Sequence, residues 1–432
     1  MARFVRLMWW CVIGATLPSC EHQLIMPDLS PRLLTSSVWS GGEIQVRVAV
    51  RPPDGTYLVL GADSLATVIV DDSTLSAPVP QANGQFHVSL KGPAGTAFLD
   101  NDVRVFGFRD FLLGPPLSGY PLIDPASPTP KVLANGETTL VSVDLRFGLA
   151  QAYPRSMHDP RCMRGPGPTP TPNVVLLGRY DPANGECTYG LWQLSAQQMV
   201  GDSMPGSLRI AAEFSANRWL IGSAHQICLR SLQPAFSDCR QFEEPNDVRF
   251  SPRADRAIVY YAFSTTNGVP VFNTATGDTS FTIHDAQSSG GGSFSSGGDT
   301  LFIAVYGTTR RLLVVDATGG QRLTSLDLAF DPEDVLAEPA SPYVYVFGWT
   351  RDTVETAHLQ IFERPSMRVV GHELKRGSFD PTPDSLCFNC DNRLVLDPTS
   401  RILYVLGIRG RDAIPAGLVQ PSPVSRFDLP PY

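Results

Sequence analysis

The most informative stretch of the sequence is LLVVDATGGQRLTSL, residues 312–326, in which an apolar strand, a tight turn and a second strand follow one another. Aspartate followed by glycine is typical of hairpin turns, because the aspartate side chain caps the turn and glycine accepts a positive φ. The same order recurs in VFNTATGDTSFTI, residues 271–283, and less closely in residues 191–200 and 360–370. We therefore expect a series of β-hairpins in the C-terminal part of the chain.

A second repeated element precedes each hairpin and consists of a small turn that leads into an apolar strand. Three copies begin at Phe214, Phe250 and Phe294, and related copies occupy residues 338–346 and 396–405. Two elements of this kind give four strands in each repeat. Four strands with a period of about 40–45 residues are typical of a β-propeller blade.

The segments VVDATG, residues 314–319, and YVYV, residues 343–346, resemble the YVTN and WD40-like family of bacterial β-propellers. The resemblance covers residues 173–432 and implies a β-propeller of about six blades, with seven as the alternative. The last blade lacks a fourth strand after Phe427, so an upstream strand, which we place between residues 141 and 180, would close the ring. A second pair of β-sandwiches is the alternative architecture.

Shorter alternating segments fill residues 41–148, and IQVRVAV, residues 44–50, has the period of two of a half-buried strand. About seven such strands predict an N-terminal, immunoglobulin-like β-sandwich, although a Cys-Trp-Cys core is absent. We place a tether at residues 20–40 and a Pro-rich linker at residues 149–172. Within the linker, GPGPTPTP at residues 165–172 is typical of a stiff spacer or of an ordered strap on the next domain.

Residues 1–19 have the pattern of a lipoprotein signal peptide, because Arg3 and Arg6 precede an apolar run that is too short to span a bilayer. The sequence LPSC, residues 17–20, resembles the lipobox of bacterial lipoproteins, although its proline departs from the usual pattern. This resemblance implies lipidation of Cys20, with ordinary secretion as the alternative. Glu21 is not the aspartate that retains many lipoproteins at the inner membrane, so an outer-membrane protein facing the periplasm or the cell surface is expected.

The composition of the 432-residue chain excludes a mostly helical protein, because 38 prolines are spread along it. The formal net charge is −8, and removal of residues 1–19 with their two arginines would make it −8 − 2 = −10. Such an acidic chain argues against nucleic acid as a partner, since nucleic-acid binding needs basic patches that neutralise phosphates.

Six cysteines would remain in the mature chain besides Cys20, and an even number in an exported protein indicates disulfides. We expect sequence neighbours to pair: Cys162 with Cys187, Cys228 with Cys239, and Cys387 with Cys390. The last pair forms a CxxC motif, for which a redox dithiol or half of a zinc site is the alternative.

No catalytic set is spelled out by the sequence. The dipeptides His158-Asp159 and His284-Asp285 imply no catalytic pairing by adjacency alone, and Gly290–Gly292 is expected to be a flexible loop between blades. Carboxylates near the starts of predicted inner strands could face a central channel: Glu243, Glu244, Asp247, Asp331, Glu333 and Asp334. Because Asp247 and Asp334 precede corresponding strands, these two are the candidate metal ligands.

These observations favour an exported, lipid-anchored cell-envelope protein that acts as a binding or scaffold module, with a protein or glycan ligand at its propeller loops. We assign it no cofactor and no catalytic residue. The alternative is a surface enzyme, lactonase-like or another hydrolase, with Ca²⁺ or another divalent cation in the central channel. A quinone-dependent dehydrogenase is disfavoured because the Trp-rich blade repeats of that family are absent.

Overall fold

The computed structural model describes residues 29–432 except 94, 114–116, 125–128, 130, 137, 148, 160, 163–165, 168, 170–172, 206–209, 216–217, 223–225, 233–234, 242–244, 254, 262–267, 287–288, 352–354, 377–393, 407–421 and 431–432. The described residues form strands, turns and loops only, as predicted, and they contain no helix that could span a membrane. The expected signal peptide, Cys20, Cys387 and Cys390 lie outside the described residues.

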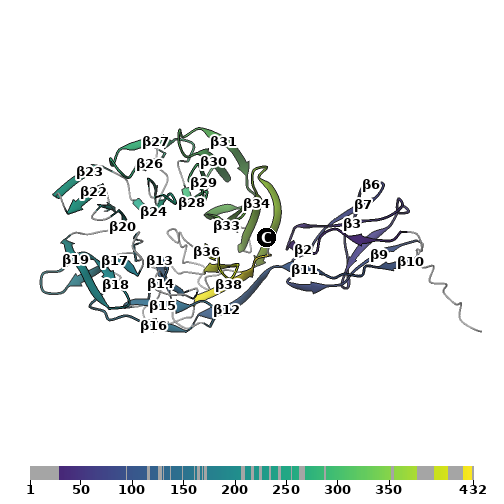
Figure 1. Cartoon of the computed structure of the whole chain (residues 1–432), viewed down its shortest axis with the longest axis horizontal. Helices are drawn as coiled ribbons and strands as arrows, with labels where there is room; N and C mark the ends of the chain where they lie inside the picture. The colour runs from purple at the N-terminus through teal and green to yellow at the C-terminus, as the bar shows by residue number, and fades with distance from the viewer. Residues whose placement is uncertain are drawn as a thin grey trace, which may run out of the picture. The chain divides into compact units, whose positions relative to one another are not determined.

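The chain divides into two compact units (Figure 1). The described part of the first unit comprises residues 29–38, 43–79 and 85–104, and the second comprises residues 39–42, 80–84 and 105–432. The first unit contains two four-stranded sheets with the orders β1-β3-β7-β6 and β10-β9-β4-β5. A further sheet has the order β2-β11-β8. The strands of these three sheets are β1 (Arg32–Leu33), β2 (Ser37–Trp39), β3 (Glu43–Arg47), β4 (Tyr57–Leu60), β5 (Asp63–Ser64), β6 (Val68–Asp71), β7 (Thr74–Pro78), β8 (Gly84–Phe86), β9 (Val88–Gly92), β10 (Gly95–Phe98) and β11 (Val103–Phe106).

The alternation predicted for residues 44–50 is confirmed in β3. Ile44 and Val46 are fully buried, whereas the residues on either side of them are exposed. Side chains of a strand point alternately to its two faces, so one face of β3 packs into the core and the other faces solvent.

The second unit contains seven sheets among its described residues, with the orders β13-β14-β15-β16, β17-β18-β19, β20-β21-β22-β23, β24-β25-β26-β27, β28-β29-β30-β31, β32-β33-β34-β35 and β12-β38-β37-β36. Figure 1 shows these sheets around a common centre. The first strands are β12 (Phe108–Leu113), β13 (Ser118–Ile123), β14 (Lys131–Asn135), β15 (Leu140–Asp144), β16 (Ala150–Ala152), β17 (Val174–Asp181), β18 (Glu186–Gln193), β19 (Gln198–Pro205), β20 (Ile210–Ser215), β21 (Arg218–Gly222), β22 (Gln226–Leu232), β23 (Ala235–Gln241), β24 (Pro245–Phe250) and β25 (Arg256–Tyr261). The remaining strands are β26 (Val269–Asn273), β27 (Thr279–Ile283), β28 (Ser289–Phe294), β29 (Thr300–Val305), β30 (Arg311–Asp316), β31 (Arg322–Asp327), β32 (Asp331–Ala337), β33 (Tyr343–Arg351), β34 (Glu355–Glu363), β35 (Arg368–Arg376), β36 (Leu394–Asp397), β37 (Ile402–Leu406) and β38 (Ser422–Asp428).

An upstream strand completes the last sheet, as expected, but it is β12 rather than a strand between residues 141 and 180. β12 pairs antiparallel with β38, with Phe108 opposite Phe427 and Leu113 opposite Ser422. Residues 105–148, which we assign from the sequence to the N-terminal sandwich, therefore lie in the second unit. Alternation of apolar residues predicts a strand but does not say which sheet the strand joins.

The region expected to be a linker, residues 149–172, also takes part in the second unit. β16 pairs with β15, Tyr153 and Met157 are buried, and Gly167 forms an isolated bridge with Leu176 of β17. The described residues of this region are thus closer to an ordered strap than to a free spacer.

Buried apolar side chains fill the space between neighbouring sheets. The cluster between the β28–β31 and β32–β35 sheets includes Phe302, Phe330 and Val346. Similar clusters join β24–β27 to β28–β31, β32–β35 to β36–β38, β36–β38 to β13–β16, and β13–β16 to β17–β19. Because β17, β20 and β24 also lie next to one another in this order, each sheet neighbours the next around a circle, as expected of a β-propeller.

Trp39 falls in the stretch that we assign from the sequence to the tether, yet it is a core residue of the second unit. Its side chain is 4% exposed and stacks on Phe427 with ring centroids 5.0 Å apart. Tyr343 meets the same indole edge-on at 5.5 Å. These contacts bury a large aromatic surface in the cluster that joins β32–β35 to β36–β38.

Side-chain hydrogen bonds hold the repeated Phe-Ser turn. The Ser251 hydroxyl donates to Asp255 at 2.5 Å and accepts the Arg256 amide at 3.2 Å. Ser295 donates to Asp299 at 2.5 Å in the corresponding turn of the next sheet. The serine hydroxyl is the main reason why the pKa of each aspartate is lowered.

The predicted hairpin turns are also confirmed. The Asp316 carboxylate accepts the amides of Thr318 and Gly319 at 3.0 and 2.9 Å, and Gly320 has a φ of 75°. Asn273 caps the equivalent turn of the preceding sheet by accepting the amide two residues later at 2.8 Å. The Asp and Gly positions of the repeat therefore have local structural roles.

Gly290, Gly291 and Gly292 lie in β28, and the expectation of a flexible loop is wrong. A Cβ atom on Gly290 would lie 2.7 Å from the carbonyl oxygen of Glu333, and one on Gly291 would lie 2.8 Å from Asp334 Oδ1. The glycines thus allow β28 to approach β32 closely. Glycine-rich sequences usually mark loops, but here the absence of side chains is needed for a strand that packs against a neighbouring backbone.

Candidate functional site

Asp334, one of the two candidate metal ligands, is a fully buried hydrogen-bond acceptor in β32. Its Oδ1 accepts the Val335 amide at 2.8 Å and Arg249 Nη2 at 3.1 Å, and its Oδ2 accepts the Leu394 amide at 2.9 Å. These donors come from β32, β24 and β36. The carboxylate therefore links three strands of three different sheets, and both of its oxygens have protein donors.

Asp247, the other candidate, occupies the corresponding place in β24. It lies opposite Tyr260 after a register shift, as Asp334 lies opposite Phe347 after a register shift. The side chain of Asp247 is outside the described structure, as are Glu243 and Glu244. The equivalence expected from the sequence is present in the backbone register.

The remaining carboxylates of the predicted set have separate partners. Asp331 forms an ion pair with Arg310 at 2.8 Å, and Glu333 accepts Trp349 Nε1 at 2.9 Å. Within the described side chains, no three His, Cys, Asp or Glu residues converge in a way that could hold a metal ion.

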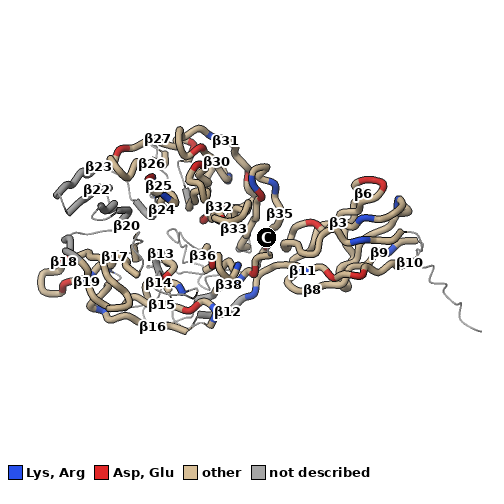
Figure 2. The backbone as a smooth tube through the Cα atoms, in the orientation of Figure 1, with Lys and Arg blue, Asp and Glu red and all other residues tan. Residues whose placement is uncertain are grey.

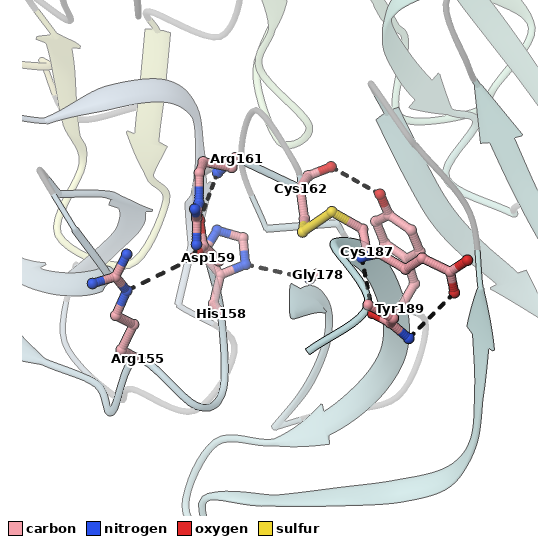
Figure 3. The surroundings of a disulfide bond; sticks show 10 residues. Arg155, His158, Asp159, Arg161, Cys162, Gly178, Cys187 and Tyr189 are labelled. Carbon is pink, nitrogen blue, oxygen red and sulfur yellow. Dashed lines mark hydrogen bonds and ion pairs between the residues drawn. A yellow bond between two sulfur atoms is a disulfide. The ribbon is translucent and has the colours of Figure 1, made fainter. Parts of the chain in front are cut away.

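One of the three expected disulfides is described. Cys162 and Cys187 are bonded, with Cα atoms 5.6 Å apart (Figure 3). Cys228 and Cys239 are directly opposite each other in the register of β22 and β23, and their side chains are not among those that the structure describes.

His158 and Asp159 are adjacent in sequence but have different partners (Figure 3). His158 Nδ1 accepts the Gly178 amide at 3.3 Å, so Nε2 carries the proton and donates to Asn135 Oδ1 at 2.8 Å. Burial lowers the pKa of His158 to about 4. Asp159 instead binds Arg161 at 2.7 Å, so this dipeptide has a structural role.

The structure brings together two histidines that no local sequence pattern connects. His358 Nδ1 lies 3.0 Å from His372 Nε2, and His358 Nε2 lies 2.9 Å from Thr350 Oγ1. The imidazole of His358 stacks on Phe330 with centroids 4.7 Å apart. Burial lowers the pKa of both histidines, that of His358 to about 4, so the pair is neutral near pH 7.

A cavity of about 690 Å³ lies between the β28–β31 and β32–β35 sheets. Three turns surround it, at residues 296–299, 339–342 and 364–367, and side chains of β29, β30 and β31 complete the wall. Its lining residues are Ser296, Asp299, Thr300, Phe302, Val314, Leu323, Thr324, Pro339, Ala340, Ser341, Pro342, Arg364, Pro365 and Met367. The size is typical of ligand-binding cavities, which makes this cavity the candidate functional site.

The cavity has a mostly apolar wall. Phe302 is 1% exposed and Val314 and Met367 are also buried, whereas Leu323 is 59% exposed at the edge. Three prolines of the surrounding turns add rigid apolar surface at Pro339, Pro342 and Pro365.

Arg364 is the basic group of the cavity and is held in place by backbone carbonyls. Its Nε donates to Pro342 O at 3.3 Å, and its Nη2 donates to the carbonyl oxygens of Ser341 and Glu338. The guanidinium carbon lies 5.9 Å from the centroid of the Phe302 ring. Burial lowers the pKa of Arg364, although the carboxylate of Asp299 acts in the opposite direction.

Basic and acidic residues are also interspersed in the rest of the described chain. Figure 2 shows Lys and Arg distributed among Asp and Glu along the described backbone rather than gathered on one element. Among the residues that line the cavity, Arg364 and Asp299 are the charged ones.

Sequence reasoning does not find this cavity, because its wall comes from residues up to about seventy positions apart that belong to two sheets. One signal was visible. Arg364 and Pro365 stand where the hairpin turns of residues 316–320 and 273–277 have Ala317-Thr318 and Thr274-Ala275, so two bulky residues distinguish this turn from the two clearest copies.

Comparisons with known proteins concern the fold. No protein-family model and no curated protein matches the sequence. Among solved structures, a chain of a mitotic checkpoint complex is similar with a TM-score of 0.52 and 12% identity, over 75% of this chain and 95% of that chain. The β-propeller domain of Cps50 (Swd1) from Myceliophteria thermophila gives a TM-score of 0.49 and 10% identity, over 74% of this chain and 100% of that one. Hydrazine synthase from Kuenenia stuttgartiensis gives a TM-score of 0.42 and 16% identity, over 57% of this chain and 73% of that chain. Together with the order of the sheets, the first likeness supports a β-propeller fold.

Proposed function

We propose that this chain is an exported, lipid-anchored cell-envelope protein whose β-propeller acts as a binding or scaffold module for a protein or glycan. The observation that carries the proposal is the cavity between the β28–β31 and β32–β35 sheets, which combines an apolar wall with one fixed basic and one acidic group. A concave apolar site with few polar groups is typical of ligand binding.

The architecture that we propose is a β-sandwich followed by a propeller of seven blades. The sandwich would consist of the two four-stranded sheets of the first unit, and each of the seven sheets of the second unit would be one blade. Pairing of β12 with β38 supports this count, because an N-terminal strand that completes the last sheet is how a propeller ring is closed.

Export and lipidation at Cys20 remain part of the proposal, and the Cys162–Cys187 disulfide agrees with an oxidising compartment. The test is fractionation of the wild type and a Cys20→Ala variant, with mass spectrometry of the mature N-terminus. We expect a lipidated wild type in the membrane fraction and a variant that is lost from it. Unchanged membrane association of the variant would refute the lipid anchor.

The binding function is tested by photocrosslinking in intact cells of the native host. A photoreactive amino acid is placed at Ala340, at the cavity, and separately at Phe147, which is 74% exposed after β15. A defined adduct from at least one position supports a binding module. Absence of any adduct from both positions, at normal protein abundance, would reject it.

A further inference from the structure

We propose that the cavity between the β28–β31 and β32–β35 sheets binds an extended peptide segment, with one large apolar side chain of the peptide packed against Leu323 and the prolines of the surrounding turns. The inference rests on the proposed binding function and names the ligand class for it. It assigns the site to a protein partner rather than to a glycan.

The apolar part of the cavity suits a single large side chain. Phe302, Val314 and Met367 are already buried, so the apolar surface that a ligand would cover is that of Leu323, which is 59% exposed, and of the exposed prolines Pro339, Pro342 and Pro365. Removal of this surface from water would drive binding. A volume of about 690 Å³ exceeds that of one aromatic side chain and leaves room for the adjoining peptide backbone.

The polar part of the cavity fits a peptide group. The described hydrogen bonds of Arg364 use Nε and Nη2, so Nη1 can donate to a ligand carbonyl. The described hydrogen bonds of Asp299 use Oδ1, so Oδ2 can accept a ligand N–H. A fixed donor and a fixed acceptor in one cavity match the C=O and N–H groups of a peptide backbone.

The same features disfavour a glycan. A sugar ring presents several hydroxyl groups, and each would lose water without gaining a partner against the prolines and Leu323. The aromatic ring of the cavity, Phe302, is 1% exposed and therefore offers no open face on which a sugar could stack.

The test measures binding of defined probes to the full chain by saturation-transfer NMR and titration. The probes are acetylated and amidated pentapeptides with Trp or Ala between two pairs of glycines, and a disaccharide of N-acetylglucosamine. Two variants alter the cavity at exposed positions, Leu323→Asp at its edge and Ala340→Trp, which fills it. Phe147→Asp is the matched control, because it also replaces an exposed apolar residue with aspartate but lies outside the cavity lining. Thermal unfolding of each variant shows that it is folded.

We expect the Trp peptide to bind at least about tenfold more tightly than the Ala peptide, and both cavity variants to weaken it by at least about tenfold, with no change in Phe147→Asp. Equal binding of the two peptides, binding that the cavity variants leave unchanged, or binding of the disaccharide alone would overturn the inference. Crosslinking separates this failure from failure of the proposed function. An adduct from position 147 but none from position 340 would remove the cavity as the site while a binding module remains.

Discussion

Replacement of Asp334 with alanine should destabilise the second unit strongly. The substitution leaves the amides of Val335 and Leu394 without their acceptor, and both residues are at least 95% buried. It also removes the carboxylate from Arg249, whose side chain is only 20% exposed. Breaking a buried ion pair from one side typically costs about 3–5 kcal/mol, and each buried amide left without a partner costs about 1–3 kcal/mol. Because these terms share one site and do not add, we expect a loss of about 3–5 kcal/mol.

The assay is urea unfolding of the full chain, followed by tryptophan fluorescence and circular dichroism. Asp331→Ala is the matched control from the same strand, because Asp331 pairs with Arg310, which is 44% exposed. An exposed pair contributes about 0–1 kcal/mol, so this control should shift the unfolding midpoint little. If Asp334→Ala fails to fold, Asp334→Asn keeps the shape but places an N–H₂ group against a donor, which should cost about 1–3 kcal/mol.

Equal midpoints for the Asp334→Ala and Asp331→Ala variants would refute this reasoning. Treatment with a chelator provides a second test of this reasoning. If the Asp334 oxygens are occupied by protein donors, EDTA should leave the midpoint of the wild type unchanged. A chelator-induced loss in the wild type that is absent from Asp334→Ala would mean that the carboxylate binds a cation instead.

Three further outcomes are expected from the same unfolding assay. Gly290→Ala should lower the free energy of unfolding by about 1–3 kcal/mol, because the new Cβ would lie 2.7 Å from the Glu333 backbone. Gly297→Ala, whose Cβ would have its nearest atom at 3.5 Å, should be nearly neutral, and equal effects would contradict the close approach of β28 and β32. Loss of the Cys162–Cys187 bond, which has a sequence separation of 25 residues, should lower the free energy of unfolding by about 3.5 kcal/mol in the loop-entropy model; a Cys162→Ser, Cys187→Ser variant as stable as the oxidised wild type would contradict this. Stability should fall as the pH falls from 6.5 towards 4, because His158 binds a proton in the unfolded chain but, with a pKa of about 4, does not bind it in the folded protein. This lowers the free energy of unfolding by about 3 kcal/mol, and a His158→Gln variant whose pH dependence equals that of the wild type would disprove it.

The features that the sequence predicts well are local. The turn from Ser251 to Asp255 and the hairpin from Asp316 to Gly320 involve residues four positions apart, so their hydrogen bonds follow from residue type and spacing. The same holds for the alternation in β3, where the position of each side chain depends only on its neighbours. These elements recur because each copy can form its own bonds without reference to the rest of the chain.

The features that the sequence does not predict depend on distant partners. β12 and β38 are separated by more than 300 residues, and the alternation of apolar residues in either strand does not predict that they pair with each other. The cavity likewise requires Phe302, Ala340 and Arg364 to meet from three separate segments. The sequence wrongly predicts a loop at Gly290 for the same reason, because glycine is needed there only by the close approach of the Glu333 backbone in the next sheet.

Several arginines of the second unit hold turns in place. Of 34 basic residues only three are lysines, and several arginines donate to the backbone carbonyls of turns. Arg253, in the turn after β24, and Arg256, the first residue of β25, donate to Gly297 O and Gly298 O in the corresponding turn of the next sheet. Arg364 holds the turn beside the cavity through two of its nitrogens. A planar guanidinium can make several such bonds at once, which a lysine ammonium on a flexible stem does not do with the same geometry. The turns that form the cavity are therefore fixed before a ligand arrives, and a site that is already ordered loses less conformational entropy on binding.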